Sequence, residues 1–268
     1  MRTRSLVFAG LAVVAVAGGV ALFAPRVAKT EVGTATVTSA APPPEPVVTP
    51  QTSEWCGEGV ESWPGDVCHI DGRQGGPRKT LVIWLHGVIG KNTHWSQDHV
   101  KMLSRVAKET KIEILFPKGI LGEQVYGWPG TAEAQAADEE GLIAQWMSTK
   151  ALVEKREGMT FGETFVFGFS SGAYFASSLA LRGRVDGVNG YAVLCGGQPM
   201  AAEPPARVAP VFIGVCADDG TTAAHSRAYA GSLAAAGVPR MVDEEAVSHD
   251  LSPNHFLHAL AYLRRGKD

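Results

Sequence analysis

The hydrophobic positions of the chain form short apolar runs that alternate with amphipathic stretches from Lys79 onward. Short bounded runs predict buried strands, and apolar positions at helical spacing predict helices. The expected strands cover residues 80–85, 112–116, 164–167, 191–194, 211–215 and 241–247, and the expected helices cover 96–108, 132–157, 171–182, 221–235 and 252–264. The last strand contains Asp and Glu, which an edge strand tolerates. This order predicts an α/β fold with a mostly parallel central sheet flanked by helices on both faces.

The first residues have the pattern of an export signal. Arg2 and Arg4 precede a run from Ser5 to Ala24 without any charged residue. The small residues Ala15 to Ala17 suit a cleavage site, whereas the length of the run also suits an uncleaved anchor. We expect residues 1–29 to be a signal peptide or an N-terminal membrane anchor, 30–54 a Pro-rich linker, and 55–268 one globular domain. Both alternatives place the domain outside the cytoplasm, either secreted or periplasmic, or anchored to the membrane.

The composition narrows the classes of partner. Hydrophobic residues make up 45% of the chain, which is enough for a core, and the formal net charge is -3. No basic patch stands out, so nucleic acid is not an expected partner. The four cysteines are an even number in an exported chain, which favours disulfides over buried free thiols. No CxxC occurs, and therefore neither a zinc knuckle nor a thioredoxin-type site is expected.

The segment Gly168 to Gly172 follows the strand predicted at 164–167 and reads Gly-Phe-Ser-Ser-Gly. This Gly-x-Ser-x-Gly pattern is typical of a nucleophile elbow, a tight turn from a strand into a helix that exposes the central serine. The turn strains the serine backbone and leaves no room for a side chain at the flanking glycines. We therefore predict Ser170 as a nucleophile. The alternative is a Gly-rich turn without catalysis.

A serine hydroxyl needs a base within hydrogen-bond reach, and the base needs an orienting acid. Asp218 follows the strand predicted at 211–215, and His249 follows the strand predicted at 241–247. We assign Asp218 as the acid and His249 as the base, because His249 alone among the histidines lies in a loop directly after a late strand. Asp219 is the alternative acid, since a register of one residue is hard to fix from sequence.

An oxyanion requires two backbone N–H donors. The amide of Ser171, directly after the nucleophile, is the first expected donor. The second is expected in the loop after the strand at 80–85, which reads His86-Gly87-Val88. We favour the amide of Val88, with that of Gly87 as the alternative. A plain strand-ending turn is the other interpretation of the His-Gly pair.

These motifs, in this order and spacing, resemble those of the α/β-hydrolase superfamily over about Lys79 to Arg264. The short loops are most similar to its compact esterases, the phospholipase/carboxylesterase, dienelactone-hydrolase-like and polyhydroxybutyrate-depolymerase-like branches. Two departures stand out. A single Gly follows His86 where hormone-sensitive-type lipases have a run of glycines, and Ala173-Tyr174 follows the elbow where polyester depolymerases often have another small residue.

The resemblance also bears on the cysteines, for which three pairings are possible. In this fold the strands at 191–194 and 211–215 are neighbours, which places Cys195 and Cys216 at the same edge of the sheet. The resemblance therefore implies the pairs Cys195–Cys216 and Cys56–Cys68. The first pair would brace the loop that follows residue 216.

The expected activity is hydrolysis of a carboxylic ester through a Ser-Asp-His triad and an acyl-enzyme. The alternatives are an acyltransferase or a peptidase with the same triad, or a non-catalytic binding module on this fold. We expect a small-molecule, lipid or polyester ester as substrate, an open cleft without a large lid, and Trp95 and Trp128 as pocket residues or plain packing residues. No cofactor motif occurs, and neither His-Glu-x-x-His nor a carboxylate cluster indicates a catalytic metal.

Overall fold

The computed structural model describes residues 48–72, 79–198 and 208–265. The described residues belong to one compact unit within Val47–Asp268. The predicted signal peptide or anchor and most of the predicted linker lie outside the described residues. Gln51 pairs with Ser62 in an isolated bridge, so the end of the predicted linker lies against the domain. Among the described helices, none is long and apolar enough to cross a bilayer.

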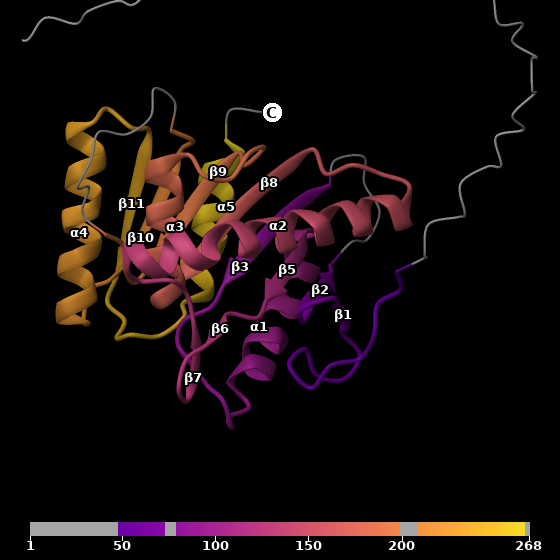
Figure 1. Cartoon of the computed structure of the whole chain (residues 1–268). Coiled ribbons are helices and arrows are strands. Elements are labelled where there is room, and N and C mark those ends of the chain that lie inside the picture. Colours follow the sequence, from indigo (N-terminus) through magenta and orange to yellow (C-terminus); the bar gives the residue numbers. More distant parts are fainter. Residues whose placement is uncertain (1–47, 73–78, 199–207, 266–268) are drawn as a thin grey trace, which may run out of the picture. The chain divides into compact units, whose positions relative to one another are not determined.

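The central sheet has eight strands in the order β1-β2-β5-β3-β8-β9-β10-β11 (Figure 1). The first two pairings, β1 with β2 and β2 with β5, are antiparallel, and the remaining pairings are parallel. The strands are β1 Glu61–Trp63, β2 Val67–Asp71, β3 Thr80–Leu85, β5 Glu113–Pro117, β8 Glu163–Phe169, β9 Gly190–Leu194, β10 Val211–Cys216 and β11 Arg240–Glu245. Strands β3, β8, β9 and β10 are buried along their whole length, as apolar runs in a parallel sheet require.

The helices are α1 Trp95–Thr110, α2 Ala132–Glu157, α3 Ser171–Arg182, α4 Gly220–Ala235 and α5 Pro253–Arg264. Helices α2, α3 and α4 share one hydrophobic core with one face of the sheet, and α1 and α5 share a second core with the other face. Two local signals read from the sequence are present. Gly183 ends α3 in the left-handed conformation, and the hydroxyl of Ser252 caps α5. The predicted α/β fold with helices on both faces is confirmed.

A second, three-stranded sheet lies beside the end of β3. It consists of β4 Ile89–Gly90, β6 Ile120–Leu121 and β7 Val125–Gly127, in the order β4-β7-β6. These strands are too short to show a hydrophobic period, so the sequence predicts loops over these residues. They fold the segment before α2 back over the loop that follows β3.

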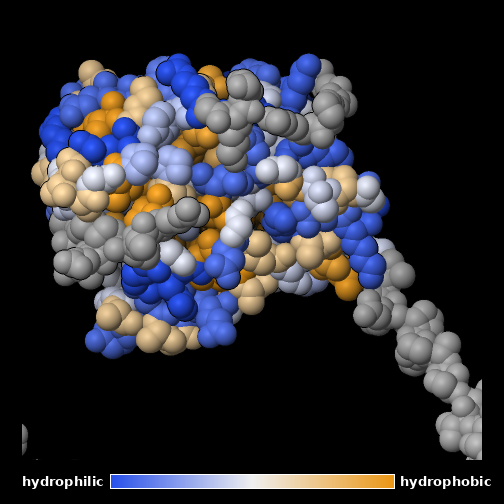
Figure 2. Space-filling model, turned by 90° about the horizontal axis from the view of Figure 1, so that it is seen from above, coloured by the Kyte–Doolittle hydropathy of each residue, from blue (hydrophilic) through white to orange (hydrophobic). Residues whose placement is uncertain are grey.

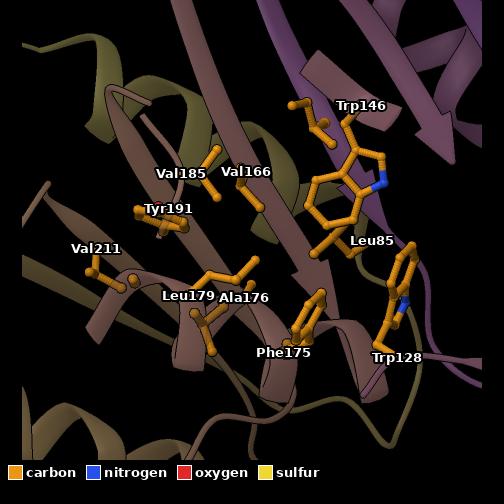
Figure 3. Close-up of a cluster of buried hydrophobic side chains, with 14 of the residues drawn as sticks. Leu85, Trp128, Trp146, Val166, Phe175, Ala176, Leu179, Val185, Tyr191 and Val211 are labelled. Carbon is orange, nitrogen blue, oxygen red and sulfur yellow. The ribbon is translucent and has the colours of Figure 1, made fainter. Parts of the chain in front are cut away.

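The core on the α2–α3 side contains several aromatic residues (Figure 3). The ring of Trp128 stacks on that of Phe175 with 6.0 Å between centroids and meets the edge of Trp146 at 5.7 Å. All three side chains are buried. This contact fixes the loop between β7 and α2 against the helix that begins at the elbow.

Strand β11 forms one edge of the central sheet, as expected for the last strand. Its residues alternate between exposed and half-buried, and they include Arg240 and three acidic residues. Charged side chains on an edge strand oppose pairing with a second chain. The view from above shows hydrophilic and hydrophobic residues interspersed over the visible face of the domain (Figure 2).

Candidate active site

Ser170 lies between β8 and α3, at φ 51° and ψ -118°, a strained conformation for a residue with a side chain. Its N–H donates to the carbonyl of Leu194 at the end of β9. A Cβ atom at Gly168 would lie 2.2 Å from the carbonyl oxygen of Gly172, and one at Gly172 would lie 2.1 Å from that of Leu85. The two glycines therefore let the helix approach β3 and β8 closely enough to form the tight turn, as the motif predicts.

Ser170 and His249 are in hydrogen-bond contact. The Ser170 Oγ lies 2.7 Å from Nε2 of His249, and Nδ1 of the same ring lies 2.6 Å from Oδ2 of Asp219. The carboxylate holds the Nδ1–H tautomer, which leaves Nε2 free to accept the serine proton. The ring of Phe169 lies 5.3 Å from that of His249. Three segments far apart in the sequence thus form a Ser-His-Asp arrangement.

The prediction of Asp218 as the partner of His249 is wrong, and the structure brings Asp219 to that place. The N–H groups of Ala217 and Asp218 donate to the carbonyls of Glu245 and Val247, so the pairing with β11 continues past the end of β10. Asp218 is exposed. The chain turns only at Asp219, the residue that precedes α4. Because the turn comes one residue later than Asp218, it is the carboxylate of Asp219 that reaches His249.

Thr222, in the first turn of α4, is a contact that the sequence analysis did not find. Its hydroxyl donates to Oδ2 of Asp219 and lies 3.5 Å from Nδ1 of His249. The hydrogen bond from Thr222, together with that from His249, lowers the pKa of Asp219 against a smaller opposing effect of burial. The carboxylate therefore remains ionised at neutral pH. The only signal in the sequence is the Asp-x-x-Thr spacing at a helix start.

The loop after β3 lies directly against the elbow. A Cβ atom at Gly87 would approach the Ser170 Cβ to 3.2 Å. The ring of His86 is fully buried, with Nδ1 against the carbonyl of Gly87 and Nε2 accepting from the N–H of Gly119 at 3.0 Å. Burial lowers the pKa of His86 to about 3, so the ring is neutral and donates from Nδ1. These contacts fix His86 within the loop. The sequence predicted a turn at the His86-Gly87 pair but not the contacts of the His86 ring.

The His86 carbonyl joins the same loop to its surroundings. It accepts from the N–H of Gly172 at 3.1 Å and from Nε1 of Trp128 at 2.7 Å. Trp128 is only 8% exposed and belongs to the core. Of its two predicted roles, pocket residue or packing residue, this burial favours packing. Trp128 packs beneath the loop that follows β3.

A cavity of about 500 Å³ opens beside Ser170. Trp95 lines this cavity and is 55% exposed, so its role in substrate binding stays a prediction. The cavity lies between the loop after β3, the first turns of α1, the elbow and the loop of His249. Its other lining residues are Gly87, Val88, Asp98, His99, Phe169, Asp250 and Leu251.

Both expected disulfides are present. Cys56 bonds to Cys68, and Cys195 bonds to Cys216 across the ends of β9 and β10. These bonds indicate a location outside the reducing cytoplasm. Metal-ligating side chains also lie close together in three groups of the described residues, Cys195 with Cys216 and His255, His69 with Glu113 and Glu157, and Asp243 with Glu245 and His258.

The predicted short, open connection over 196–209 falls largely on residues 199–207, which lie outside the described part of the chain. The prediction that no large lid covers the site therefore stays a prediction. So do the roles of the Ser171 and Val88 amides as oxyanion donors, because no bound ligand marks the position of an oxyanion.

Comparison with solved structures identifies the fold. A carboxylesterase from Mesorhizobium loti has a TM-score of 0.57 and 18% identity, over 82% of this chain and 100% of that one. YahD, solved with malic acid, has a TM-score of 0.56 and 17% identity, over 74% and 97%. A Bacillus cereus carboxylesterase has a TM-score of 0.51 and 18% identity, over 75% and 95%. This chain has the α/β-hydrolase fold. Comparisons with family models and with curated proteins gave no match.

Proposed function

We propose that this protein is an exported serine hydrolase that cleaves carboxylic esters, with Ser170 as nucleophile, His249 as base and Asp219 as orienting acid. One observation carries the proposal: the 2.7 Å contact of Ser170 Oγ with Nε2 of His249, on a strained elbow, with Asp219 on the far side of the ring. This is the geometry that acyl transfer by a serine requires. The carboxylesterases of the same fold are consistent with it.

In the first step, His249 accepts the proton of Ser170 while Oγ attacks the ester carbonyl. Asp219, kept ionised by Thr222 and His249, stabilises the imidazolium that forms. His249 then returns the proton to the leaving alcohol, and an acyl-Ser170 ester remains. Water, deprotonated by His249, hydrolyses this ester and restores the serine. Atoms and protons balance over the two steps without any cofactor.

The oxyanion is proposed to lie between the amides of Ser171 and Val88. Ser171 begins α3, so its N–H belongs to the unsatisfied first turn of a helix. The Gly87 carbonyl is held by the neutral ring of His86. In a trans peptide the C=O and the following N–H are antiparallel, and no cis peptide bond occurs among the residues that the structure describes. The Val88 N–H is therefore expected to point away from the His86 ring, and Val88 is one of the residues that line the cavity, which supports the proposed role of its amide.

The cavity supports an ester of small to moderate size as substrate. A volume of about 500 Å³ is within the range of small-molecule sites, roughly 300–1,000 Å³. Trp95, Phe169 and Leu251 offer apolar surface for an acyl chain. Export is proposed from the apolar start of the chain and from the two disulfides.

Hydrolysis of a p-nitrophenyl ester series from acetate to palmitate, by the wild-type protein and by Ser170→Ala, tests the proposal. We expect a rate maximum at one acyl length and loss of turnover in the variant. A second assay adds an acceptor alcohol and an amide substrate. Acyl transfer to the alcohol that is faster than hydrolysis would favour an acyltransferase. Cleavage of the amide would favour a peptidase. Equal rates for the wild-type protein and Ser170→Ala would overturn the proposed mechanism.

A further inference from the structure

A buried histidine lies against the disulfide at the edge of the central sheet. His255, in the first turn of α5, has no exposed surface, and its ring nitrogens make no hydrogen bond of ordinary geometry among the described residues, although the main-chain carbonyl of Asp243 lies near the ring. A buried imidazole whose nitrogens lack well-formed hydrogen bonds is destabilising. One ring nitrogen lies within 4.8 Å of both Cys195 Sγ and Cys216 Sγ, which lie within the same limit of each other. Both cysteines are buried.

A main-chain oxygen completes this cluster. The carbonyl oxygen of Asp250 lies 3.9 Å from Sγ of Cys195 and 3.7 Å from Sγ of Cys216. The two sulfur atoms, next to the end of β9 and at the end of β10, thus lie close both to an imidazole nitrogen of α5 and to a carbonyl oxygen of the loop before α5. Among the described cysteines, only this pair has a histidine at such a distance. The Cys56–Cys68 disulfide has no comparable third ligand in the described part of the chain.

We propose that reduction of the Cys195–Cys216 disulfide creates a binding site for Zn²⁺, with the two thiolates and His255 as ligands and the Asp250 carbonyl as the fourth. Zn²⁺ prefers thiolate and imidazole ligands in tetrahedral geometry, at about 2.3 Å from sulfur and about 2.0–2.1 Å from nitrogen. Ligand atoms at these distances lie roughly 3.3–3.8 Å apart in a tetrahedron. The Asp250 oxygen, at 3.7 and 3.9 Å from the two sulfurs, is already close to this range, the His255 nitrogen lies within 4.8 Å of each sulfur, and the two sulfurs separate once their bond is reduced.

The steps balance with a dithiol reductant. The dithiol transfers two electrons and two protons to the S–S bond and becomes a disulfide itself, leaving Cys195 and Cys216 as thiols. Zn²⁺ then replaces the two thiol protons, which pass to solvent. In the reverse sequence Zn²⁺ is released, and a small-molecule disulfide accepts two electrons from the thiolates and becomes two thiolates itself, which restores the Cys195–Cys216 bond. Either state cross-links β9 to β10.

The site lies beneath the segments that carry the triad. Cys216 ends β10 and leads into the turn of Asp219, and Asp250 directly follows His249. A cation bound to Cys216 and to the Asp250 carbonyl would hold both segments when the covalent bond is absent. The proposed site therefore preserves the arrangement of Asp219 and His249 under reducing conditions. The binding itself does not depend on the proposed hydrolase activity.

Metal titration of the full chain, reduced with a water-soluble phosphine, tests the proposal. The probes are Zn²⁺, followed by competition with a chromophoric chelator, and Co²⁺, followed by absorption. We expect one Zn²⁺ per chain after reduction and none before it, and Co²⁺ spectra with thiolate-to-metal charge-transfer bands and tetrahedral ligand-field bands. The matched variants are Cys195→Ser with Cys216→Ser, His255→Gln, and Cys56→Ser with Cys68→Ser.

The control pair Cys56→Ser with Cys68→Ser should retain full binding. The Cys195/Cys216 double variant and His255→Gln should weaken Zn²⁺ binding by roughly a hundredfold or more, because each loses ligands of the site. Zn²⁺ should raise the thermal midpoint of the reduced wild-type protein and leave that of reduced His255→Gln unchanged. Circular dichroism of the oxidised variants checks their folding.

Two results would overturn the proposal. One is equal Zn²⁺ affinity of the reduced wild-type protein and His255→Gln, which is also the result expected if the reduced chain unfolds and binds Zn²⁺ through free thiols. The other is the absence of charge-transfer bands in the reduced wild-type protein with Co²⁺.

Discussion

The carboxylate of Asp219 accepts a hydrogen bond from Nδ1 of His249 at 2.6 Å, while the adjacent carboxylate of Asp218 is exposed. Adjacent residues of the same type make a matched pair of variants. We expect Asp219→Asn to lower kcat about ten-thousand-fold, because an amide favours the wrong imidazole tautomer. Asp218→Asn should keep kcat within a few-fold. Steady-state kinetics on a p-nitrophenyl ester distinguish the two, and a larger effect at Asp218 would refute the assignment of the acid.

Removal of the nucleophile or the base should abolish turnover. Ser170→Ala and His249→Ala should each lower kcat about a million-fold, and the double variant should be no worse, since the two groups act as a unit. Ser148→Ala, an exposed serine on α2, is the control and should behave as wild type. Burst kinetics and labelling by a fluorophosphonate report on Ser170 directly. Labelling of Ser170→Ala at the wild-type rate would place the nucleophile elsewhere.

Gly172→Ala should damage both the fold and the site, because the new methyl group would lie 2.1 Å from the Leu85 carbonyl oxygen. We expect a loss of about 1–3 kcal/mol in the free energy of unfolding and a loss of activity. Gly141→Ala is the matched control on α2, where nothing lies within 4 Å of the added Cβ. It should raise stability by about 0.5–1 kcal/mol. Urea denaturation measures both, and a neutral Gly172→Ala would contradict the close approach of α3 to β3.

His86→Phe removes the hydrogen bonds to the Gly87 carbonyl and from the Gly119 N–H but keeps a buried ring. If His86 positions the Val88 amide, kcat should fall by about 10²–10³ with little change in KM, as for loss of an oxyanion donor. With its pKa lowered to about 3, His86 stays neutral at the pH of any esterase assay, so the defect should not depend on pH. A rise in KM with an unchanged kcat would indicate instead that His86 only packs against the loop. Circular dichroism monitors folding.

His69 should make stability depend on pH. Burial alone lowers its pKa, but hydrogen bonds with Glu113 and Glu61 raise the pKa above its ordinary value of 6.5. A group with a raised pKa stabilises the fold below its unfolded pKa, and the contribution is lost as the pH rises through the folded pKa. The loss in the free energy of unfolding caused by His69→Gln should therefore be larger at about pH 6 than at about pH 9, and the difference should be on the order of 1 kcal/mol.

Urea denaturation of His69→Gln at both pH values, beside the exposed control His94→Gln, measures this difference. A destabilisation that is the same at both values, or larger at the higher pH, would contradict a protonated His69 between the two carboxylates.

The strands at the centre of the sheet and all the helices follow from local pattern. Buried parallel strands such as β3 and β8 read as uninterrupted apolar runs, and Gly183 and Ser252 mark helix ends through their own conformational preferences. The antiparallel strands β1 and β2 and the small sheet were not predicted. Their few residues carry no clear period, and their pairing depends on partners in other segments.

Within the site, the sequence by itself determined the elbow at Ser170 and the loop of His249, because a Gly-x-Ser-x-Gly motif and a position after a late strand are local features. The tertiary structure decided between Asp218 and Asp219, placed Trp128 in the core, and brought His255 against Cys195 and Cys216. In each case the decision rests on contacts between segments distant in sequence: the extra hydrogen bonds between β10 and β11, the stacking on α3, and the docking of α5 on the sheet. Local propensity does not predict such contacts, because they form only when distant segments come together in the folded sheet.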